Sequence, residues 1–210
     1  MARPPQDAQI RINEILNAAD QLFFTQGYHA TTISDIAKKM GVAQGMLYYY
    51  FKSKEELLET LLERHTASLI EEIKKILSFA RTPSEKIALT VSAILATADY
   101  KDGLLLSMLY DVQNLHIKDK LFYQLELTLS PWLLKIVDEG IATHNFRVSH
   151  PPTAVWYILV IIEALTIALY QKSSPDILSF RLKMAEALIE KTLGAQEQTI
   201  HIRPTGQADI

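Results

Sequence analysis

The sequence of 210 residues predicts an all-α fold, with a small helix-turn-helix domain at the amino terminus and a larger helical domain after it. Three observations support this prediction. Apolar residues recur at helical spacing along most of the chain. No segment shows the alternation of apolar and polar residues that is typical of strands. The glycines and prolines are few, and most of them lie at the expected ends of helices.

The end residues of the first two helices are clear in the sequence. A helix over about residues 9–26 carries an apolar face and ends at Gly27. Thr32 stands three residues before Asp35, a variant of the capping box that opens a second helix. Gly41 follows this helix, where a helix end needs a residue that tolerates a positive φ. The second helix is therefore expected to end in a sharp turn at Gly41.

A third helix, at about residues 43–49, is rich in aromatic residues. Leu47, and with it Tyr50 and Phe51, are expected to face inward. The three tyrosines could be core residues, but at 100° per residue they cannot all face inward. Two short helices at this spacing can place the second in a DNA major groove. The residues expected to face outward are Ala43, Gln44, Gly45, Tyr48 and Tyr49.

A further helix starts at Ser53, which forms a Ser-x-x-Glu capping box with Glu56. Its first backbone N–H groups, with Lys54 beside them, form a natural phosphate site. Residues 1–54 hold six Lys and Arg against four Asp and Glu, a net charge of +2, within a chain of net charge −3. Such modest positive charge favours a dimer that binds two half-sites.

The motifs in this segment are Ile15-Leu16, Ala18-Ala19, Leu22-Phe23, Gly27-Tyr28, Thr31-Thr32-Ile33, Asp35-Ile36-Ala37, Gly41-Val42, Gly45, the run from Leu47 to Phe51 and the run from Ser53 to Leu57. Together they resemble the amino-terminal domain of the TetR family of transcriptional regulators. The resemblance is dense over about residues 10–60, and the rest of the chain matches only in helical layout and length. It implies DNA contacts at Thr32, Gln44, Gly45, Tyr48, Tyr49 and Lys54.

The start of the third helix departs from the family, in which Ser or Lys is common at this place. Here it is Ala43-Gln44. Ala43 offers a methyl group suited to the methyl group of thymine, and Gln44 can form two hydrogen bonds with adenine. Direct recognition of guanine by this helix is expected to be weak, because it contains neither Arg nor Lys.

Helices are also predicted for the remainder of the chain. Pro131 is expected to kink or split one of them near Ser130. The tail after Gly194 is polar and is expected to be flexible. The predicted domains are residues 1–54 for DNA binding, 55–194 for effector binding and dimerisation, and 195–210 for the tail. The predicted helices span about residues 53–80, 83–99, 104–114, 118–143, 153–171 and 175–193.

The segment 154–170 is apolar on all sides except for Glu163. A membrane span is one interpretation, but the segment is short and a carboxylate at the bilayer centre is costly. A helix buried between its own domain and a second subunit explains it better. The last helix carries two adjacent apolar rows, so the two helices predict a homodimer interface. Leu165 and Leu182 are the candidate interface positions.

Aromatic and methionine residues gather in the middle of the chain, where ordinary core packing would explain each one singly. Collectively they could enclose an apolar pocket. The resemblance strengthens this hypothesis, because family members commonly bind a small effector in this domain. The candidate effector-binding residues are Met108, Phe122, Tyr123, Trp132 and Trp156.

Composition narrows the remaining possibilities. The chain has no cysteine, which excludes disulfides and is compatible with the cytoplasm. Its six histidines lack metal-ligand spacing, and no phosphate-binding glycine loop or nucleophile elbow is present. We therefore expect no metal, no cofactor and no enzymatic activity, and a cytoplasmic protein that is not a membrane protein.

The leading hypothesis is a ligand-responsive transcriptional regulator that binds double-stranded DNA as a homodimer. It would most simply be a repressor, released from a palindromic operator by a small apolar effector that is still unknown. An enzyme and a helical protein–protein adaptor are the alternatives. The adaptor would share the helical bundle but would not need the exposed surface of the third helix.

Overall fold

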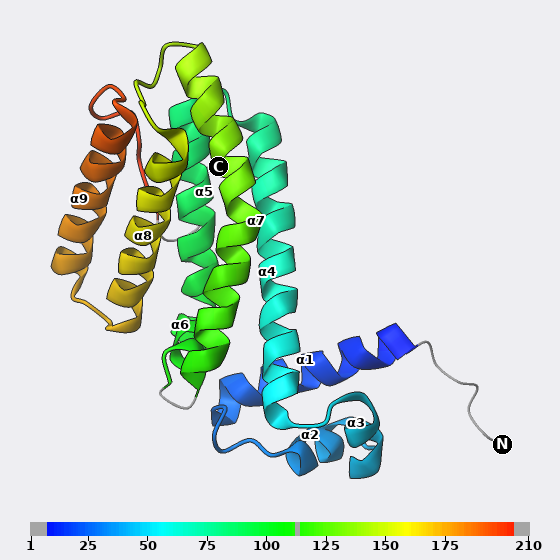
Figure 1. Cartoon of the computed structure of the whole chain (residues 1–210). Helices are drawn as coiled ribbons and strands as arrows, with labels where there is room; N and C mark the ends of the chain where they lie inside the picture. The colour runs from blue at the N-terminus through cyan, green and yellow to red at the C-terminus, as the bar shows by residue number, and fades with distance from the viewer. Residues whose placement is uncertain (1–7, 112–113, 204–210) are drawn as a thin grey trace. The chain divides into compact units, whose positions relative to one another are not determined.

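The structure, a computed structural model, describes residues 8–111 and 114–203, and within these ranges it contains nine α-helices and no strand (Figure 1). The all-α prediction is therefore confirmed. The chain divides into two compact units, residues 1–65 and 66–210. The division falls inside α4, so it does not test the predicted domain boundary at residue 54. The first unit holds α1 (Ala8–Gln26), α2 (Ile33–Met40), α3 (Gln44–Tyr50) and the first part of α4 (Lys54–Phe79).

The core of the first unit forms where the sequence predicts it. α2 packs against α1 and against α3. Leu47 of α3 and the adjacent Phe51 are buried, as expected, whereas Tyr50 is only partly buried. Burying a large apolar side chain stabilises the fold by about 1.5–3 kcal/mol, so this small cluster can hold three short elements in place. The largest fully buried side chains are Ile15, Leu16, Phe23, Ile36, Leu47, Leu57, Leu58 and Leu61.

The second unit is a helical bundle in which α8 packs against α5, α6, α7 and α9. The rest of α4 contributes Leu69 and Ile73 to its core. Two helices start earlier than the sequence predicts. α6 begins at Tyr100 and not at about residue 104, and α7 begins at Leu115 and not at about residue 118. The elements of this unit are α5 (Pro83–Ala98), α6 (Tyr100–Leu109), α7 (Leu115–Ala142), α8 (Pro151–Tyr170) and α9 (Pro175–Leu193).

Pro131 does not split α7, which is continuous from Leu115 to Ala142. A proline inside a helix removes the hydrogen bond to the carbonyl four residues earlier, here that of Leu127. Both Pro131 and Leu127 are exposed. Water can therefore reach the carbonyl of Leu127, which lowers the cost of the missing bond.

The described part of the predicted tail, residues 195–203, packs against the second unit, and its flexibility stays a prediction. Ile200 and Ile202 are buried in the core of the second unit. Glu190 of α9 is itself buried and accepts hydrogen bonds from the backbone N–H groups of Thr199 (2.8 Å) and Ile200 (2.9 Å). Backbone donors of this kind leave no periodic pattern in the sequence. The rest of the predicted tail, residues 204–210, lies outside the described residues.

α8 is long and apolar enough to cross a membrane by length and composition, which for a single helix is weak evidence. A core helix of a soluble protein passes the same test. Its packing against four neighbouring helices is that of a core helix in a bundle.

Candidate nucleic-acid interface

The turn between α2 and α3 is built as the sequence predicts. Thr32 caps α2 through a complete capping box with Asp35, and Gly41 ends the helix with φ = 66°. The N–H of Val42 then donates to the carbonyl of Ala37 at 3.0 Å. Because the glycine conformation reverses the chain within three residues, α3 starts beside the end of α2.

One face of α3 packs on the unit, and the other is open to solvent. Leu47 is fully buried, whereas Tyr49 is 82% exposed and Tyr48 is half exposed. Ala43, Gln44 and Gly45 are exposed as well. The predicted orientation of this helix is thus confirmed, and the structure brings these five residues together on one surface. Their contacts with DNA stay a prediction.

Gly45 has no role inside the chain that would require a glycine. It lies in the helical part of α3, and a Cβ atom added there would meet no atom within 4 Å. Glycine in a helix costs about 1 kcal/mol relative to alanine. A surface that must be approached closely by another molecule explains this glycine better than any packing within the protein.

The hydroxyl of Thr32 is already engaged. It donates to the carboxylate of Asp35 at 2.6 Å and accepts from the Asp35 backbone N–H at 3.1 Å. The bond from the Thr32 hydroxyl to the carboxylate, together with a bond from the Thr32 backbone N–H (2.9 Å), lowers the pKa of Asp35. Thr32 is exposed at the start of α2 as predicted, but its hydroxyl proton is not available to a phosphate in this arrangement.

Lys54 differs from its expected arrangement. Its ammonium is only partly buried and donates to backbone carbonyls between α1 and α2, namely those of Tyr28 (2.9 Å), Thr31 (3.1 Å) and His29 (3.4 Å). It also lies 4.3 Å from the centroid of the Tyr28 ring. Burial lowers the pKa of Lys54, and the carboxylate of Glu55 acts in the opposite direction.

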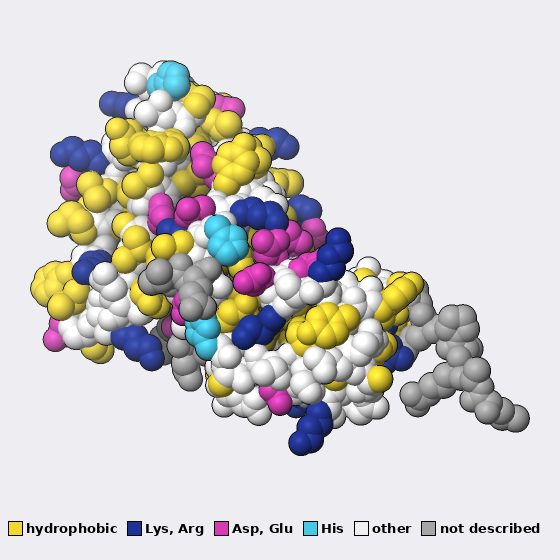
Figure 2. Space-filling model, turned by 60° about the horizontal axis from the view of Figure 1, so that its bottom comes forward, with side chains coloured by type: hydrophobic (Ala, Val, Ile, Leu, Met, Phe, Trp, Pro, Cys, Tyr) yellow, Lys and Arg dark blue, Asp and Glu magenta, His cyan; other side chains and the backbone are white. Residues whose placement is uncertain are grey.

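Positive charge on the face drawn in Figure 2 is scattered, and its dark blue lysine and arginine side chains form no continuous patch. In the first unit Lys38, Lys39 and Lys52 are exposed. With so few cations, affinity for DNA must come from two copies of the interface or from contacts to bases.

The five candidate effector-binding residues differ in their exposure to solvent. Met108 of α6 is buried, and Phe122 and Trp132 of α7 are partly buried. Tyr123 and Trp156, in contrast, are 62% and 51% exposed. Helical spacing does not reveal which side of a wide apolar helix faces inward. It therefore could not separate the two exposed residues from the other three.

An open pocket of about 370 Å³ lies elsewhere in the second unit, and none of the five candidate residues lines it. Tyr110 makes contacts that no pattern in the sequence indicates. Its ring stacks on that of Tyr170, and its hydroxyl lies 3.2 Å from that of Thr166. Burial raises the pKa of Tyr110. Among the described residues, no group of three or more His, Asp or Glu side chains could hold a metal ion.

Comparison with known proteins places the same segment in a family. Residues 15–61 match the model of "Bacterial regulatory proteins, tetR family". The chain is 32% identical to the Fatty acid metabolism regulator protein of Bacillus subtilis over 110 residues, which are 51% of this chain and 57% of that protein. It is 29% identical to the HTH-type transcriptional repressor KstR2 of Mycolicibacterium smegmatis, over 68% of this chain and 71% of that one. The chain thus spans little more than half the length of the first of these relatives.

Solved structures agree along nearly the whole chain. A TetR transcription regulator from Haloarcula marismortui superposes with a TM-score of 0.71 at 18% identity, covering 89% of this chain and 97% of that one. The transcriptional regulator FadR from Bacillus subtilis, in complex with stearoyl-CoA, gives 0.65 at 24% identity, covering 88% and 99%. At these identities the likeness establishes the fold.

Proposed function

The chain belongs to the TetR family of transcriptional regulators, and from this premise we propose that it is a repressor which binds a palindromic operator as a homodimer and is released by a small apolar effector. The observation that carries the proposal is the exposed face of α3. On this face Tyr48 and Tyr49 are exposed, and Gly45 has open space beside it. On the opposite face of the helix, the buried side chain of Leu47 holds α3 against the rest of the unit. Such a face fits the edge of a major groove and the phosphates beside it.

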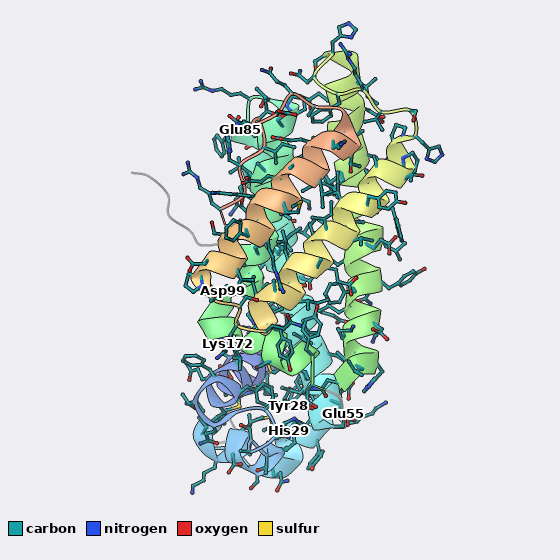
Figure 3. All side chains as sticks on the ribbon, turned by 90° about the vertical axis from the view of Figure 1, so that its left-hand side faces the viewer. Tyr28, His29, Glu55, Glu85, Asp99 and Lys172 are labelled. Carbon is teal, nitrogen blue, oxygen red and sulfur yellow. The ribbon has the colours of Figure 1, made fainter. Side chains whose placement is uncertain are left out.

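A set of exposed apolar residues on α8 and α9 supports dimerisation. On α9, Ala185 and Ile189 face the core of the unit, whereas Phe180 and Met184 are 74% and 62% exposed. α8 lies beside α9 and also presents large apolar side chains to solvent (Figure 3). A monomer rarely exposes so much contiguous apolar surface. The exposed residues on the two helices are Trp156, Tyr157, Val160, Tyr170, Ile177, Phe180, Met184 and Leu188.

Leu165 is not part of this surface, contrary to the sequence-based choice. It is 3% exposed and lies in the core of the single chain. Leu182 is partly buried against the same core. A charge at Leu165 would unfold the unit rather than separate two subunits, so neither position tests the dimer cleanly.

Gln44 is proposed to recognise a base, because its amide can donate to and accept from adenine in the major groove. Gln44→Ala is expected to relax the preference at one base pair in each half-site, at a cost of about 1–3 kcal/mol for the preferred base. Binding to a panel of operators, each changed at one position, measures this. If affinity falls equally for all members of the panel, Gln44 holds the backbone instead.

The effector is proposed to occupy the interior of the bundle near Met108, Phe122 and Trp132. Long-chain acyl-CoA is the first compound to test, since one similar structure contains stearoyl-CoA and one relative is named for fatty acid metabolism. Its acyl chain would be the apolar part that enters the bundle, whereas its phosphates carry negative charge. Lys118 lies 5.9 Å from the centroid of the Phe122 ring, so a cation lies beside these apolar side chains, although Asp119 pairs with it at 3.5 Å.

The test begins with genomic fragments selected by the purified protein, followed by fluorescence anisotropy on the recovered site. Stearoyl-CoA is expected to release the DNA and to quench tryptophan fluorescence, with a coupling of about 1–3 kcal/mol. Free CoA is the matched control. The quenching should survive Trp156→Phe and be lost in Trp132→Phe. Failure to enrich any fragment would refute the proposed function, and release by free CoA alone would refute the apolar effector.

A further inference from the structure

The environment of the Lys54 ammonium is saturated with acceptors. An ammonium group has three N–H bonds, and three backbone carbonyls lie within 3.4 Å of it. All three come from one stretch, residues 28–31, and the ring of Tyr28 covers a further side. Figure 3 labels Tyr28 and His29 near Glu55, at this junction between the loop and the start of α4.

We propose that Lys54 is a positioning residue, which ties the first turn of α4 to the loop before α2 and thereby holds the DNA-binding face in place. It does not act as a phosphate ligand. The DNA-binding part of this inference rests on the proposed function. A phosphate could recruit the ammonium only if the contacts with the carbonyls were broken.

The loop is shaped to present its carbonyls to one point. The carbonyl of Gly27 accepts from both the backbone N–H (3.2 Å) and the hydroxyl (2.8 Å) of Thr31, so the loop folds back on itself. The side chain of Thr31 is completely buried. The N–H and the hydroxyl of Thr31 are thus satisfied within the loop, whereas the carbonyls of Tyr28, His29 and Thr31 accept from Lys54, a donor outside it.

Thr31, which accepts from Lys54, is directly bonded to the residue that caps α2. Thr31, whose carbonyl accepts from Lys54, precedes Thr32, and Thr32 caps α2 through its box with Asp35. α2 is followed by the Gly41 turn and α3. A shift in the first turn of α4 is thus passed to α2 through the backbone of Thr31, without a change in any residue that faces DNA.

The two roles predict different results in the protein without DNA. Lys54→Met keeps the apolar stem but removes all donors, and its melting temperature is expected to fall by about 4–8 °C. Lys54→Arg is also expected to lower it, because a planar guanidinium cannot direct three N–H bonds to one set of converging carbonyls. Lys52→Met is the control, since Lys52 is exposed in the same segment and its loss should leave the melting temperature unchanged.

The salt dependence of binding then separates a positioning residue from a phosphate ligand. Lys54→Met is expected to weaken operator binding about tenfold at every salt concentration, with an unchanged slope of log K against log salt. A phosphate ligand would instead lower that slope by about 0.9 for each phosphate lost. A lowered slope, a wild-type melting temperature and full binding by Lys54→Arg would together overturn the proposal.

Loss of the folded state in Lys54→Met would support the positioning role, because a phosphate ligand adds nothing to the stability of the free protein. The slope would then be measured with Lys54→Arg. If the wild-type protein bound no DNA, the proposed function would fail, yet the melting temperatures would still decide whether Lys54 holds the loop.

Discussion

Replacement of both Phe180 and Met184 by glutamate is expected to yield a folded monomer that binds the operator about 100-fold more weakly than the wild type. The two side chains are the most exposed apolar residues of α9 and make no contribution to the core of the single chain. In a dimer, the introduced carboxylates of both subunits would be buried in an apolar interface. They would lose their hydration there without gaining a partner of opposite charge, which is costly. A monomer engages one half-site and loses the contacts of the second.

Light scattering at micromolar concentration measures the mass, and anisotropy measures the affinity. Ser149→Glu places the same charge at an exposed position in the connection between α7 and α8, and it should leave both quantities unchanged. The unfolding transition of the double variant should stay cooperative, since its core is intact. A monomeric mass for the wild-type chain would refute the interface.

Gly45→Leu is expected to abolish most operator binding while the free protein becomes no less stable. The added side chain enters open space, and removing a helical glycine should stabilise α3 by about 0.4–1 kcal/mol. On DNA the same side chain would occupy the place of the groove wall. We expect a fall in affinity of about 100-fold, which corresponds to about 2.7 kcal/mol in total or about 1.4 kcal/mol for each half-site.

Gly45→Ala provides a graded comparison, because a methyl group should cost less than an isobutyl group. Asn13→Leu adds the same side chain to an exposed position on α1 and should leave binding unchanged. Unchanged affinity of Gly45→Leu would show that no molecule approaches this glycine closely, and the orientation of α3 on DNA would have to be reconsidered.

Features encoded by neighbouring residues could be predicted from the sequence. The Thr32–Asp35 box and the left-handed glycine at Gly41 both lie where the pattern indicates. Each depends on contacts within four residues, so local chemistry is sufficient. The outward face of α3 could be predicted for the same reason, because Leu47 alone orients a helix of seven residues.

Features formed by distant backbone groups could not be predicted. The carbonyls that bind Lys54 belong to residues 23 to 26 positions away, and a carbonyl is present in every residue. Periodicity also could not distinguish Leu165, which faces its own core, from Phe180, which faces solvent. Both belong to wide apolar faces, and only the position of neighbouring helices decides which row is covered.

The anchored tail has a genetic consequence. The N–H of Ile202 donates to Glu186 of α9 at 2.7 Å, and that of Arg203 donates to the hydroxyl of Ser92 on α5 at 2.9 Å, so the end of the described chain fastens α9 to α5. A nonsense codon just after Gly194 would spare every helix yet remove Ile200 and Ile202, which contribute about 1.5–3 kcal/mol each. If the chain is a repressor, as proposed, a selection for constitutive expression of its target genes should recover late stop codons between residues 195 and 202 together with lesions in the DNA-binding face.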